Sequence, residues 1–381
     1  MPRLSAVLAV LTLALLALPA AAQIAAQADA CTLIAEERAG SLEHPWGVAF
    51  LPDGTALVTE RSGRLLLVDP RTGDRQPVEG APAVAARGQG GLLDIALHPD
   101  FASNALVYLS FSEPRDGGTA TAVGRGRLVR DGGGMRLDGF TVITRMAKAS
   151  GGGRHFGSRL AFAPDGALFV TMGERGDRPR AQDPFDHAGS VLRVNDDGSI
   201  PVDNPFADGR KGKPEIWSIG HRNPQGAAIH PDSGLIWTVE HGARGGDEIN
   251  QPRPGRNYGW PVISYGRHYS GLPIGEGTSK PGMEQPVFYW DPSIAPSGMA
   301  FVTGPMFPAW RGDILVGALK DRLLSRLDME NGRVVAEERL FEGALGRIRD
   351  VRMGPDGAIW LLTDSPSGGL YRLTPEDGVC G

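Results

Sequence analysis

The chain has 381 residues, a length that allows one large domain or two ordinary ones, and its 41% hydrophobic content is enough for a substantial core. The 54 glycines and 30 prolines favour many short strands joined by tight turns over long helices. The net charge of −5 has the wrong sign for a general nucleic-acid binder, and no run of Lys or Arg marks an anionic membrane surface as a partner.

The first residues are typical of a targeting segment. One positive charge precedes an apolar stretch over residues 6–18, which is short for a membrane span, and a small-x-small cleavage motif ends at Ala22. We therefore expect a signal peptide over residues 1–22, cleaved after Ala22, and a periplasmic or secreted mature chain. An uncleaved anchor is the alternative. No other segment is long and apolar enough to cross a bilayer, so we expect no stable membrane insertion.

One structural unit recurs along the mature chain. Each copy is a short apolar strand, a turn that contains Pro-Asp, and a second apolar strand. Proline presets φ at the first turn position, and the aspartate side chain hydrogen-bonds back to the local backbone. Successive copies lie about 45–75 residues apart, which suits propeller blades of roughly 40–50 residues with insertions. The first strands of the copies begin at Gly47, Leu93, Leu160, Gly226, Val351 and, in a weaker form, Gly298.

This repeat predicts an all-β fold, a six-bladed β-propeller with four-stranded antiparallel blades that forms a single domain over residues 23–381. Seven blades are the alternative count, and five blades would make too small a ring. A ring brings the chain ends together, and Cys31 and Cys380 lie at those ends. Because export implies an oxidising compartment, a disulfide between them is plausible, with two free thiols as the alternative.

Five clusters of residues are surplus to the repeat. Each lies next to a predicted blade strand, and the equivalent loops of a propeller point to one face, so the clusters can converge although they are far apart in sequence. Their cationic side chains would make a positive pocket suited to a ligand with several carboxylates. The clusters are RGQGGLL (87–93), GRHFGSR (153–159), GHRNPQG (220–226), EHGARGGDEIN (240–250) running on to NYGWP (257–261), and GRIRD (346–350).

From about residue 45 to residue 374 the chain resembles the quinoprotein glucose/sorbosone dehydrogenase family. Within that family it is most similar to the bacterial aldose sugar dehydrogenases that use pyrroloquinoline quinone (PQQ). Any one shared motif would be a weak signal, but five in the family's order on a blade repeat are specific. The motifs are GQGGLLDIALHPDF, HFGSRLAFAPDG, GHRNPQG, EHGARGGDEIN with NYGWP, and RIRDV.

The resemblance implies that His155 is the general base, which takes the proton of the anomeric hydroxyl while hydride passes from C1 of the sugar to the quinone. It also implies a catalytic role for Arg222. A larger set of residues is implied to surround PQQ, whose carboxylates explain the cationic side chains. This set comprises Gln89, Arg222, Asn223, His241, Tyr269, Trp290, Ala318, Leu319, Lys320, Arg347, Ile348 and Arg349.

The resemblance further implies two calcium ions. The backbone carbonyls of Gly242 and Ala243 match ligands of a calcium ion that bridges to PQQ and polarises its quinone carbonyl. Glu248, the Tyr258 carbonyl and Asp247 match a second, structural calcium site. For the Asp-Glu pair, a solvated surface loop is the alternative.

The chain departs from the glucose dehydrogenase branch of the family at two positions. Arg154 stands where that branch has an acidic residue before the base, and His241 stands where it has Gln. Both features resemble the aldose dehydrogenase branch, which is less selective for glucose. Ala243 replaces a common Pro, a change that a carbonyl ligand tolerates.

We therefore expect a quinoprotein dehydrogenase that oxidises the C1 hydroxyl of aldoses to lactones, passes the electrons to a periplasmic cytochrome or quinone, and acts as a monomer. Two alternatives remain. A lactonase-type calcium hydrolase would need carboxylates and Asn around one central metal, whereas the clusters here are rich in Arg and Lys. A non-enzymatic propeller that binds a sugar or a protein is disfavoured by the intact His155 and Gln89 positions. No nicotinamide or flavin fingerprint and no serine nucleophile elbow occur.

Overall fold

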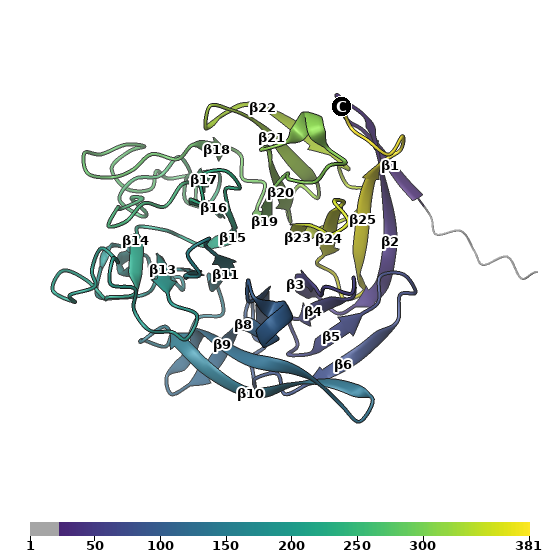
Figure 1. Cartoon of the computed structure of the whole chain (residues 1–381). Coiled ribbons are helices and arrows are strands. Elements are labelled where there is room, and N and C mark those ends of the chain that lie inside the picture. Colours follow the sequence, from purple (N-terminus) through teal and green to yellow (C-terminus); the bar gives the residue numbers. More distant parts are fainter. Residues whose placement is uncertain (1–22) are drawn as a thin grey trace, which may run out of the picture.

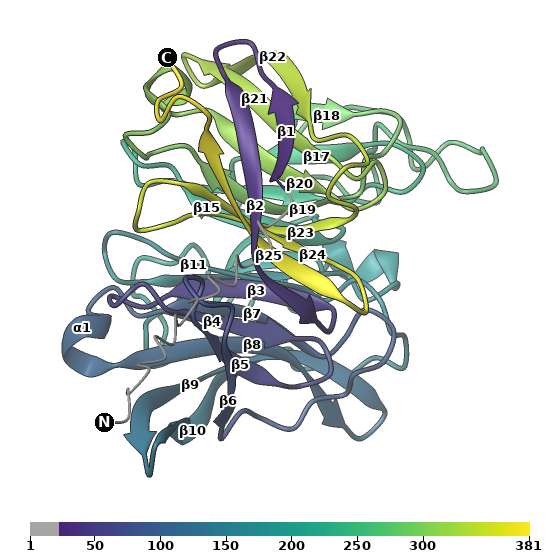
Figure 2. The same cartoon turned by 90° about the vertical axis from the view of Figure 1, so that its right-hand side faces the viewer.

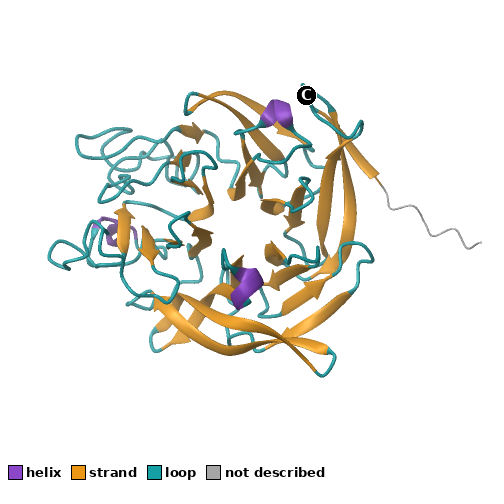
Figure 3. Ribbon diagram, viewed as in Figure 1, coloured by secondary structure: helices purple, strands orange, loops and turns teal. Residues whose placement is uncertain are grey.

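Strands dominate the computed structural model, which describes residues 23–381. In this part of the chain the only helical segments are one α-helical turn, α1 (Phe101–Asn104), and two 3-10 turns, η1 (Arg178–Gln182) and η2 (Pro308–Trp310); Figure 3 shows them as small purple coils among strands and loops. The sheets stand around a central axis in a ring, as in a β-propeller (Figure 1). The all-β prediction is therefore confirmed. The predicted signal peptide, residues 1–22, lies outside the described residues.

Three of the sheets each consist of four antiparallel strands that follow one another in the chain. The first contains β11 (Gly157–Phe162), β12 (Leu168–Met172), β13 (Ser190–Val194) and β14 (Ile216–Ile219). The second contains β15 (Pro224–Ile229), β16 (Ile236–Glu240), β17 (Asp247–Asn250) and β18 (Phe288–Trp290). The third contains β19 (Pro296–Phe301), β20 (Ile314–Ala318), β21 (Leu324–Glu330) and β22 (Arg333–Leu340).

A fourth sheet has eight strands, because two antiparallel groups of four are joined at their outer edges. One group contains β3 (Pro45–Phe50), β4 (Ala56–Glu60), β5 (Leu65–Val68) and β6 (Arg75–Glu79). The other contains β7 (Leu92–Leu97), β8 (Leu106–Arg115), β9 (Gly118–Asp131) and β10 (Gly134–Arg145). The junction is a short parallel pairing of β6 with β10, in which Val78 lies opposite Met135 and Glu79 opposite Arg136.

The fifth sheet closes the ring with strands from both ends of the described chain. Its order is β1 (Gln23–Gln27), β2 (Thr32–Leu42), β25 (Gly368–Pro375), β24 (Ile359–Thr363) and β23 (Ile348–Met353). Figure 2 shows β2 and β25 side by side, paired antiparallel from Leu33 opposite Pro375 to Leu42 opposite Gly368. The predicted disulfide between Cys31 and Cys380 is confirmed and lies beside this pairing, with the two Cα atoms 5.1 Å apart.

Removal of this disulfide tests how much the closure contributes to stability. The bond joins residues 349 positions apart, so it restricts the unfolded chain strongly, and we expect the Cys31→Ser/Cys380→Ser variant to lose about 2 to 4 kcal/mol of the free energy of unfolding. Urea unfolding of the two proteins measures the difference. An unchanged midpoint with an unchanged slope would show that the pairing of β2 with β25 holds the ring closed without the bond.

The turns of the repeat have the predicted chemistry. Asp53 Oδ1 accepts a hydrogen bond from the Thr55 amide at 2.9 Å in the turn between β3 and β4, and Gly54 takes a left-handed φ of 84° there. Asp165 accepts from the Ala167 amide at 3.0 Å in the turn between β11 and β12. All these turns lie at one end of the inner strands, so the segments that precede the inner strands emerge together at the other end.

The hydrophobic core lies between neighbouring sheets. One cluster, for example, packs Trp237 and Ile249 of the β15–β18 sheet against Met299 and Val316 of the β19–β22 sheet, all of them buried. Such packing follows from strands whose side chains alternate between two covered faces. It leaves the axis of the ring to polar side chains of the innermost strands.

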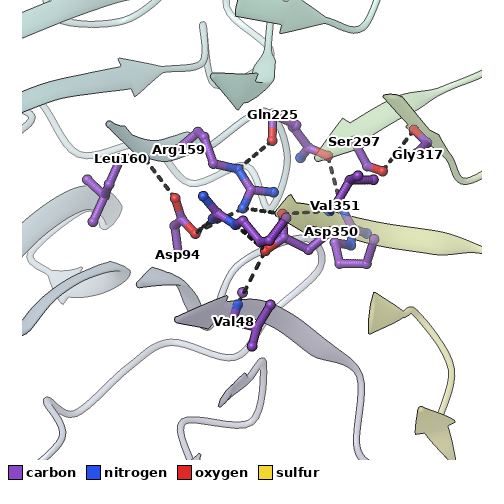
Figure 4. A network of polar contacts seen from close by, with 12 residues as sticks. Val48, Asp94, Arg159, Leu160, Gln225, Ser297, Gly317, Asp350 and Val351 are labelled. Carbon is purple, nitrogen blue, oxygen red and sulfur yellow. Dashed lines mark hydrogen bonds and ion pairs between the residues drawn. The ribbon is translucent and has the colours of Figure 1, made fainter. Parts of the chain in front are cut away.

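Four charged side chains meet on that axis (Figure 4). Arg159 of β11 donates from Nη1 to Asp94 of β7 at 2.9 Å and to Asp350 of β23 at 2.8 Å. Arg352 of β23 reaches the same two carboxylates at 2.7 and 3.0 Å. Arg159, Asp94 and Asp350 are at most 1% exposed. This axial network ties three inner strands from distant parts of the chain together.

Candidate functional site

A histidine–carboxylate pair lies at the end of the ring from which the inner strands emerge. His155, in the loop before β11, makes a 2.5 Å contact through Nδ1 with Oε1 of Glu174, which follows β12. His155 is 9% exposed and Glu174 is 1% exposed. The backbone of His155 has a left-handed φ of 54°, which L-residues avoid unless their surroundings impose it, and such strain is common at functional sites.

Two amide side chains hold the loop that carries His155. Oε1 of Gln89 accepts from the His155 amide at 2.7 Å, and Oδ1 of Asn223 accepts from the Gly157 amide at 3.0 Å. Gln89 precedes β7 and Asn223 precedes β15, so three different sheets fix one imidazole. Both amide nitrogens make no hydrogen bond within residues 23–381, which leaves them free to donate to a ligand.

The surroundings of His155 favour its neutral form. Burial lowers the pKa of the imidazole most, the contact with Glu174 opposes this, and the charges of Arg222 and Arg154 lower the pKa further. With Nδ1–H donating to Glu174, Nε2 carries the lone pair and can accept a proton. Among the described residues nothing hydrogen-bonds Nε2, so the accepting nitrogen is available to a substrate.

Glu174 was not among the predicted site residues. The strand register could have identified Glu174. Gly157 pairs with Met172 in the antiparallel ladder, and the same register continued past the strand ends places position 155 opposite position 174. The same spacing recurs one sheet further on, where His221 Nδ1 contacts Glu240 Oε1 at 2.9 Å. There the histidine is fully buried, and its Nε2 contacts the Ser218 hydroxyl at 2.9 Å. The second pair therefore has no nitrogen free for chemistry.

Arg222 lies next to the His155–Glu174 pair. It is 7% exposed, its Nη1 donates to the His241 carbonyl at 3.1 Å, and its guanidinium lies 5.2 Å from the centre of the Trp260 ring. Burial lowers the pKa of Arg222, while the charge of Glu174, first among several nearby acids, raises it. The imidazole of His241 lies near both Arg222 and Arg349. Burial, and then the charges of these two arginines, hold the pKa of His241 well below its usual value.

Arg347 and Arg349 converge on a carboxylate that the sequence did not point to. Arg349 donates to Asp364 Oδ2 at 2.7 Å and Arg347 lies 3.5 Å from the same oxygen. Burial raises the pKa of Asp364, but its cationic neighbours, Arg349 above all, outweigh this and lower it strongly. Gln225 accepts a further hydrogen bond from Arg349 at 2.9 Å. Asp364 therefore fixes two of the predicted PQQ contacts.

Several buried polar atoms around these residues have no hydrogen-bond partner within the described residues. Unpartnered buried polar atoms are rare because each costs free energy. Here the unpartnered donors are associated with cationic or aromatic side chains, which suits a ligand that carries several anionic oxygens. The atoms are Arg222 Nε, His241 Nε2, Trp260 Nε1, Arg349 Nε, Asn250 Oδ1 and Glu174 Oε2. The four nitrogens thus fit a polyanionic cofactor, whereas the oxygens of Asn250 and Glu174 are acceptors that need a donor or a cation.

The predicted calcium region forms a turn and a strand beside Arg222. Asn250 Nδ2 bridges two carboxylates, donating to Glu240 at 3.0 Å and to Glu248 at 3.1 Å. Burial, and then the charge of Glu240, raise the pKa of Glu248 to about 8. Glu240, Gly242, Glu248 and Tyr258 line one small cavity with Arg222. Within residues 23–381, no group of three or more His, Cys, Asp or Glu is arranged to hold a metal.

Asp247, a predicted calcium ligand, already has several donors. Its Oδ1 accepts from the Gly242 amide at 2.7 Å, and its Oδ2 accepts from the Ser293 hydroxyl at 2.7 Å and from the Ile294 and Ala295 amides at 2.8 and 3.0 Å. The carboxylate thus clamps the loop before β19 to the turn that contains Gly242. A metal at Asp247 would have to replace some of these bonds.

The remaining predicted PQQ contacts differ in how deeply they are buried. Ala318, Leu319 and Ile348 are buried, and the Leu319 carbonyl accepts from Arg347 at 3.1 Å. Lys320 donates to the Ser293 carbonyl at 2.7 Å. Tyr269 is 75% exposed in the long loop between β17 and β18.

Trp290 does not offer the open flat surface expected of it. It lies on β18, the outermost strand of its sheet (Figure 1), and is 3% exposed. Its Nε1 donates to Glu337 of β22 at 2.9 Å, so it packs between the outer strands of two neighbouring sheets. Trp260, which stacks near Arg222 and Arg178 at 5.2 and 5.5 Å, is the indole beside the site.

A ring of antiparallel sheets with a buried histidine–carboxylate pair and cationic side chains with unpartnered nitrogens at one mouth defines an enzyme-like β-propeller. The sequence profile of the glucose / sorbosone dehydrogenase family matches residues 42–372, and the chain belongs to this family.

Individual relatives agree with this assignment. The chain is 46% identical to an aldose sugar dehydrogenase of Escherichia coli, over 88% of this chain and 91% of the relative. Among solved structures, the soluble aldose sugar dehydrogenase of E. coli in its apo form superimposes with a TM-score of 0.87 at 45% identity, covering 90% of this chain and 100% of that one. A PQQ-bound aldose sugar dehydrogenase from Streptomyces coelicolor superimposes with a TM-score of 0.74 at 29% identity, covering 90% and 98%.

Proposed function

We propose that the protein is a PQQ- and calcium-dependent dehydrogenase that oxidises the C1 hydroxyl of aldoses to lactones. The observation that carries the proposal is the buried His155–Glu174 pair, whose imidazole has one free nitrogen and lies near Arg222, a buried guanidinium with an unpartnered Nε. A lone base would also suit a hydrolase, but the unpartnered donors of Arg222 and Arg349 suit an anionic cofactor.

Bound PQQ would supply the quinone that accepts hydride, and calcium would polarise its carbonyl. The residues of the chain do the rest. Nε2 of His155 takes the proton of the anomeric hydroxyl as the C1–H electron pair leaves, and Glu174 stabilises the imidazolium that results. Gln89 and Asn223 keep the base in place through the loop that carries it.

The groups that would hold the cofactor are cationic and polar side chains around His155, and Arg222 and Arg349 each have an unpartnered Nε there. Arg222, Arg347 and Arg349 would pair with carboxylates, with Lys320, Asn223 and His241 as further contacts. The carbonyls of Gly242 and Ala243 would bind the calcium ion next to PQQ. Glu248 and the Tyr258 carbonyl, with Asp247, would bind a structural one. Hard oxygen ligands of this kind are those that Ca²⁺ prefers.

The ring is best described as six blades. Two blades make up the eight-stranded sheet, and each of the other four sheets counts as one. The channel mouth on the side of the Pro-Asp turns supports this count, because one inner strand of each blade lines its cavity of about 540 Å³. The lining segments are 48–50, 95–97, 160–162, 227–229, 299–301 and 352–353.

We further propose a location outside the cytoplasm, with a periplasmic cytochrome or quinone as the electron acceptor and a monomer as the working form. The disulfide between Cys31 and Cys380 supports export, because such bonds persist in oxidising compartments. N-terminal sequencing of the secreted protein would locate the cleavage site, which we expect after Ala22.

Reconstitution tests the activity. Protein purified without cofactor is expected to reduce a dye with glucose only after PQQ and Ca²⁺ are both added, and chelation of calcium during reconstitution should prevent it. Hydrolysis of lactones without PQQ, or binding of sugar with no dye reduction in PQQ-loaded protein, would contradict the proposal in favour of a hydrolase or a sugar-binding propeller.

A Glu174→Gln variant tests the pairing of Glu174 with His155. The carboxylate favours the imidazolium, so its loss should lower the pKa of His155 further, and the acid limb of kcat/KM should move to lower pH. The plateau above the limb should fall roughly ten- to a hundredfold, a part of the 10²–10⁴ that general-base catalysis contributes. A pH profile of PQQ-loaded protein measures both effects. An unmoved limb and plateau would contradict the pairing.

A further inference from the structure

A second cavity, of about 470 Å³, is lined by Arg154 and Arg175, the chain neighbours of His155 and Glu174. Both members of the pair have a chain neighbour in its wall, since Arg154 precedes His155 and Arg175 follows Glu174. The Arg175 amide donates to the His155 carbonyl at 3.3 Å, and the charge of Arg154 acts on the His155 imidazole, so the wall of the cavity is close to the base. The proposed reaction, oxidation of a neutral sugar at C1, does not use this cavity.

The wall of this cavity is cationic although the chain as a whole is acidic. It contains four cationic side chains and two aspartates. Asp186 is shared between Arg180 at 2.9 Å and Lys148 at 3.0 Å, and Asp177 is exposed. Within residues 23–381, neither Arg154 nor Arg175 forms an ion pair. Two guanidinium charges at the cavity are therefore uncompensated by a carboxylate in contact with them.

Arg175 is the more informative of the two. It is 3% exposed, yet its guanidinium donates only to neutral acceptors: the Arg154 carbonyl, the Thr119 hydroxyl at 2.8 Å and the Gly152 carbonyl at 2.9 Å. Its Nε has no partner among the described residues, and burial, followed by the charge of Arg180, lowers its pKa to about 10. The guanidinium carbon also lies 3.4 Å from the centre of the Phe156 ring, and the charge of Glu174 acts on it without contact. A buried charge with no carboxylate in contact is costly, so an anion in the cavity would be stabilised.

Arg154 faces the same space from the other side. Its side chain is exposed and lies over the backbone of Gly176, where an added Cβ would come within 2.5 Å of Arg154 Nε. No described residue hydrogen-bonds the Arg154 guanidinium. The amides of Gly151 and Gly152 in the wall likewise donate to no acceptor in the described chain, and glycine-rich runs of free amides bind anions.

We propose that this cavity is an anion subsite for the substrate, and that the preferred substrates are acidic aldoses, either uronic acids or aldose phosphates. The inference rests on the proposed dehydrogenase function. With C1 of the sugar at His155 Nε2, an anionic group at the other end of the sugar would lie against Arg154 and Arg175. Arginine pairs with carboxylate and phosphate alike through two parallel hydrogen bonds, and the cavity is large enough for a small ligand.

Steady-state kinetics of PQQ-loaded protein test the subsite with glucose, glucuronate and glucose 6-phosphate. At low ionic strength, kcat/KM for at least one acidic sugar should exceed that for glucose about tenfold through a lower KM, and the advantage should shrink with salt. In Arg154→Gln the advantage should fall about tenfold. The control Arg136→Gln removes an exposed arginine on β10 and should leave the ratio unchanged. Whichever acidic sugar has the larger advantage identifies the anion.

Calorimetry of the protein without PQQ gives a second readout. Glucuronate or glucose 6-phosphate should bind more tightly than glucose, and Arg154→Gln should remove the difference. Glucose oxidised as well as both acidic sugars, with equal binding of all three, would overturn the subsite and leave the dehydrogenase proposal intact. Absence of dye reduction with every sugar would overturn the dehydrogenase proposal, and calorimetry would then decide the subsite alone.

Discussion

His155→Ala is expected to lower kcat for glucose by about 10²–10⁴-fold while the protein still binds PQQ. The imidazole is the one described group near Arg222 that is held by a carboxylate on one nitrogen and free to accept a proton on the other. The cofactor contacts come from other sheets, so the loss should be confined to chemistry. Dye-linked kinetics measure kcat, and titration with PQQ followed by fluorescence measures binding.

His230→Ala is the matched control for this prediction. His230 lies in a Pro-Asp turn at the opposite mouth of the ring, where it accepts from the Asp232 amide at 3.2 Å. Its loss should leave kcat unchanged. Turnover of His155→Ala at the wild-type rate would show that another group takes the proton, whereas loss of PQQ binding in that variant would show that His155 supports the cofactor.

Arg159→Leu is expected to lower the free energy of unfolding by about 3 to 5 kcal/mol, the usual effect of removing one partner from a buried ionic network. Arg352 would then be the one cation in contact with the carboxylates of Asp94 and Asp350. Two buried carboxylates that share one cation repel each other. Urea unfolding measures the loss. Because the network joins β7, β11 and β23, which follow the loops with Gln89, His155 and Arg347, the variant should also bind PQQ more weakly.

Arg136→Leu serves as the control for the axial network. Arg136 makes two ion pairs, with Asp131 at 3.0 Å and Asp138 at 2.6 Å, but all three side chains are exposed. Exposed pairs contribute little, so the variant should unfold at the same urea concentration as the wild type. If Arg159→Leu were as stable as this control, the attraction among the axial charges would only offset the free energy of burying them. The network would then serve only to set the register of the inner strands.

The repeat made the fold predictable because it is local. A Pro-Asp turn between two apolar strands can be recognised within about a dozen residues, and its chemistry is the same at Asp53 and at Asp165. The pairing of the chain ends could be predicted too, since a ring demands it. The parallel contact between β6 and β10 could not be predicted, because it depends on how far these two outermost strands extend from the ring.

Candidate site residues could be predicted where they stand in a recognisable motif. They could not be predicted where strand register alone brings them to the site. His155, Arg222 and Arg349 stand in recognisable clusters, whereas Glu174 and Asp364 follow second strands in otherwise ordinary sequence. Their roles come from what lies opposite them, which turn length and register decide. Trp290 was misplaced for a related reason: a long insertion separates β17 from β18, so its distance from the motifs gives no measure of where it packs.

The pairing of β2 with β25 has a consequence for how the protein is made. β2 emerges early in synthesis and must wait for its partner until nearly the whole chain has appeared. Arg347, Arg349 and Asp364 belong to the sheet completed at that moment, so the cofactor pocket is finished in the same step that closes the ring. A chain cut short before Gly368 would lack the β2–β25 pairing that closes the ring, and we expect it to bind PQQ more weakly than the whole chain.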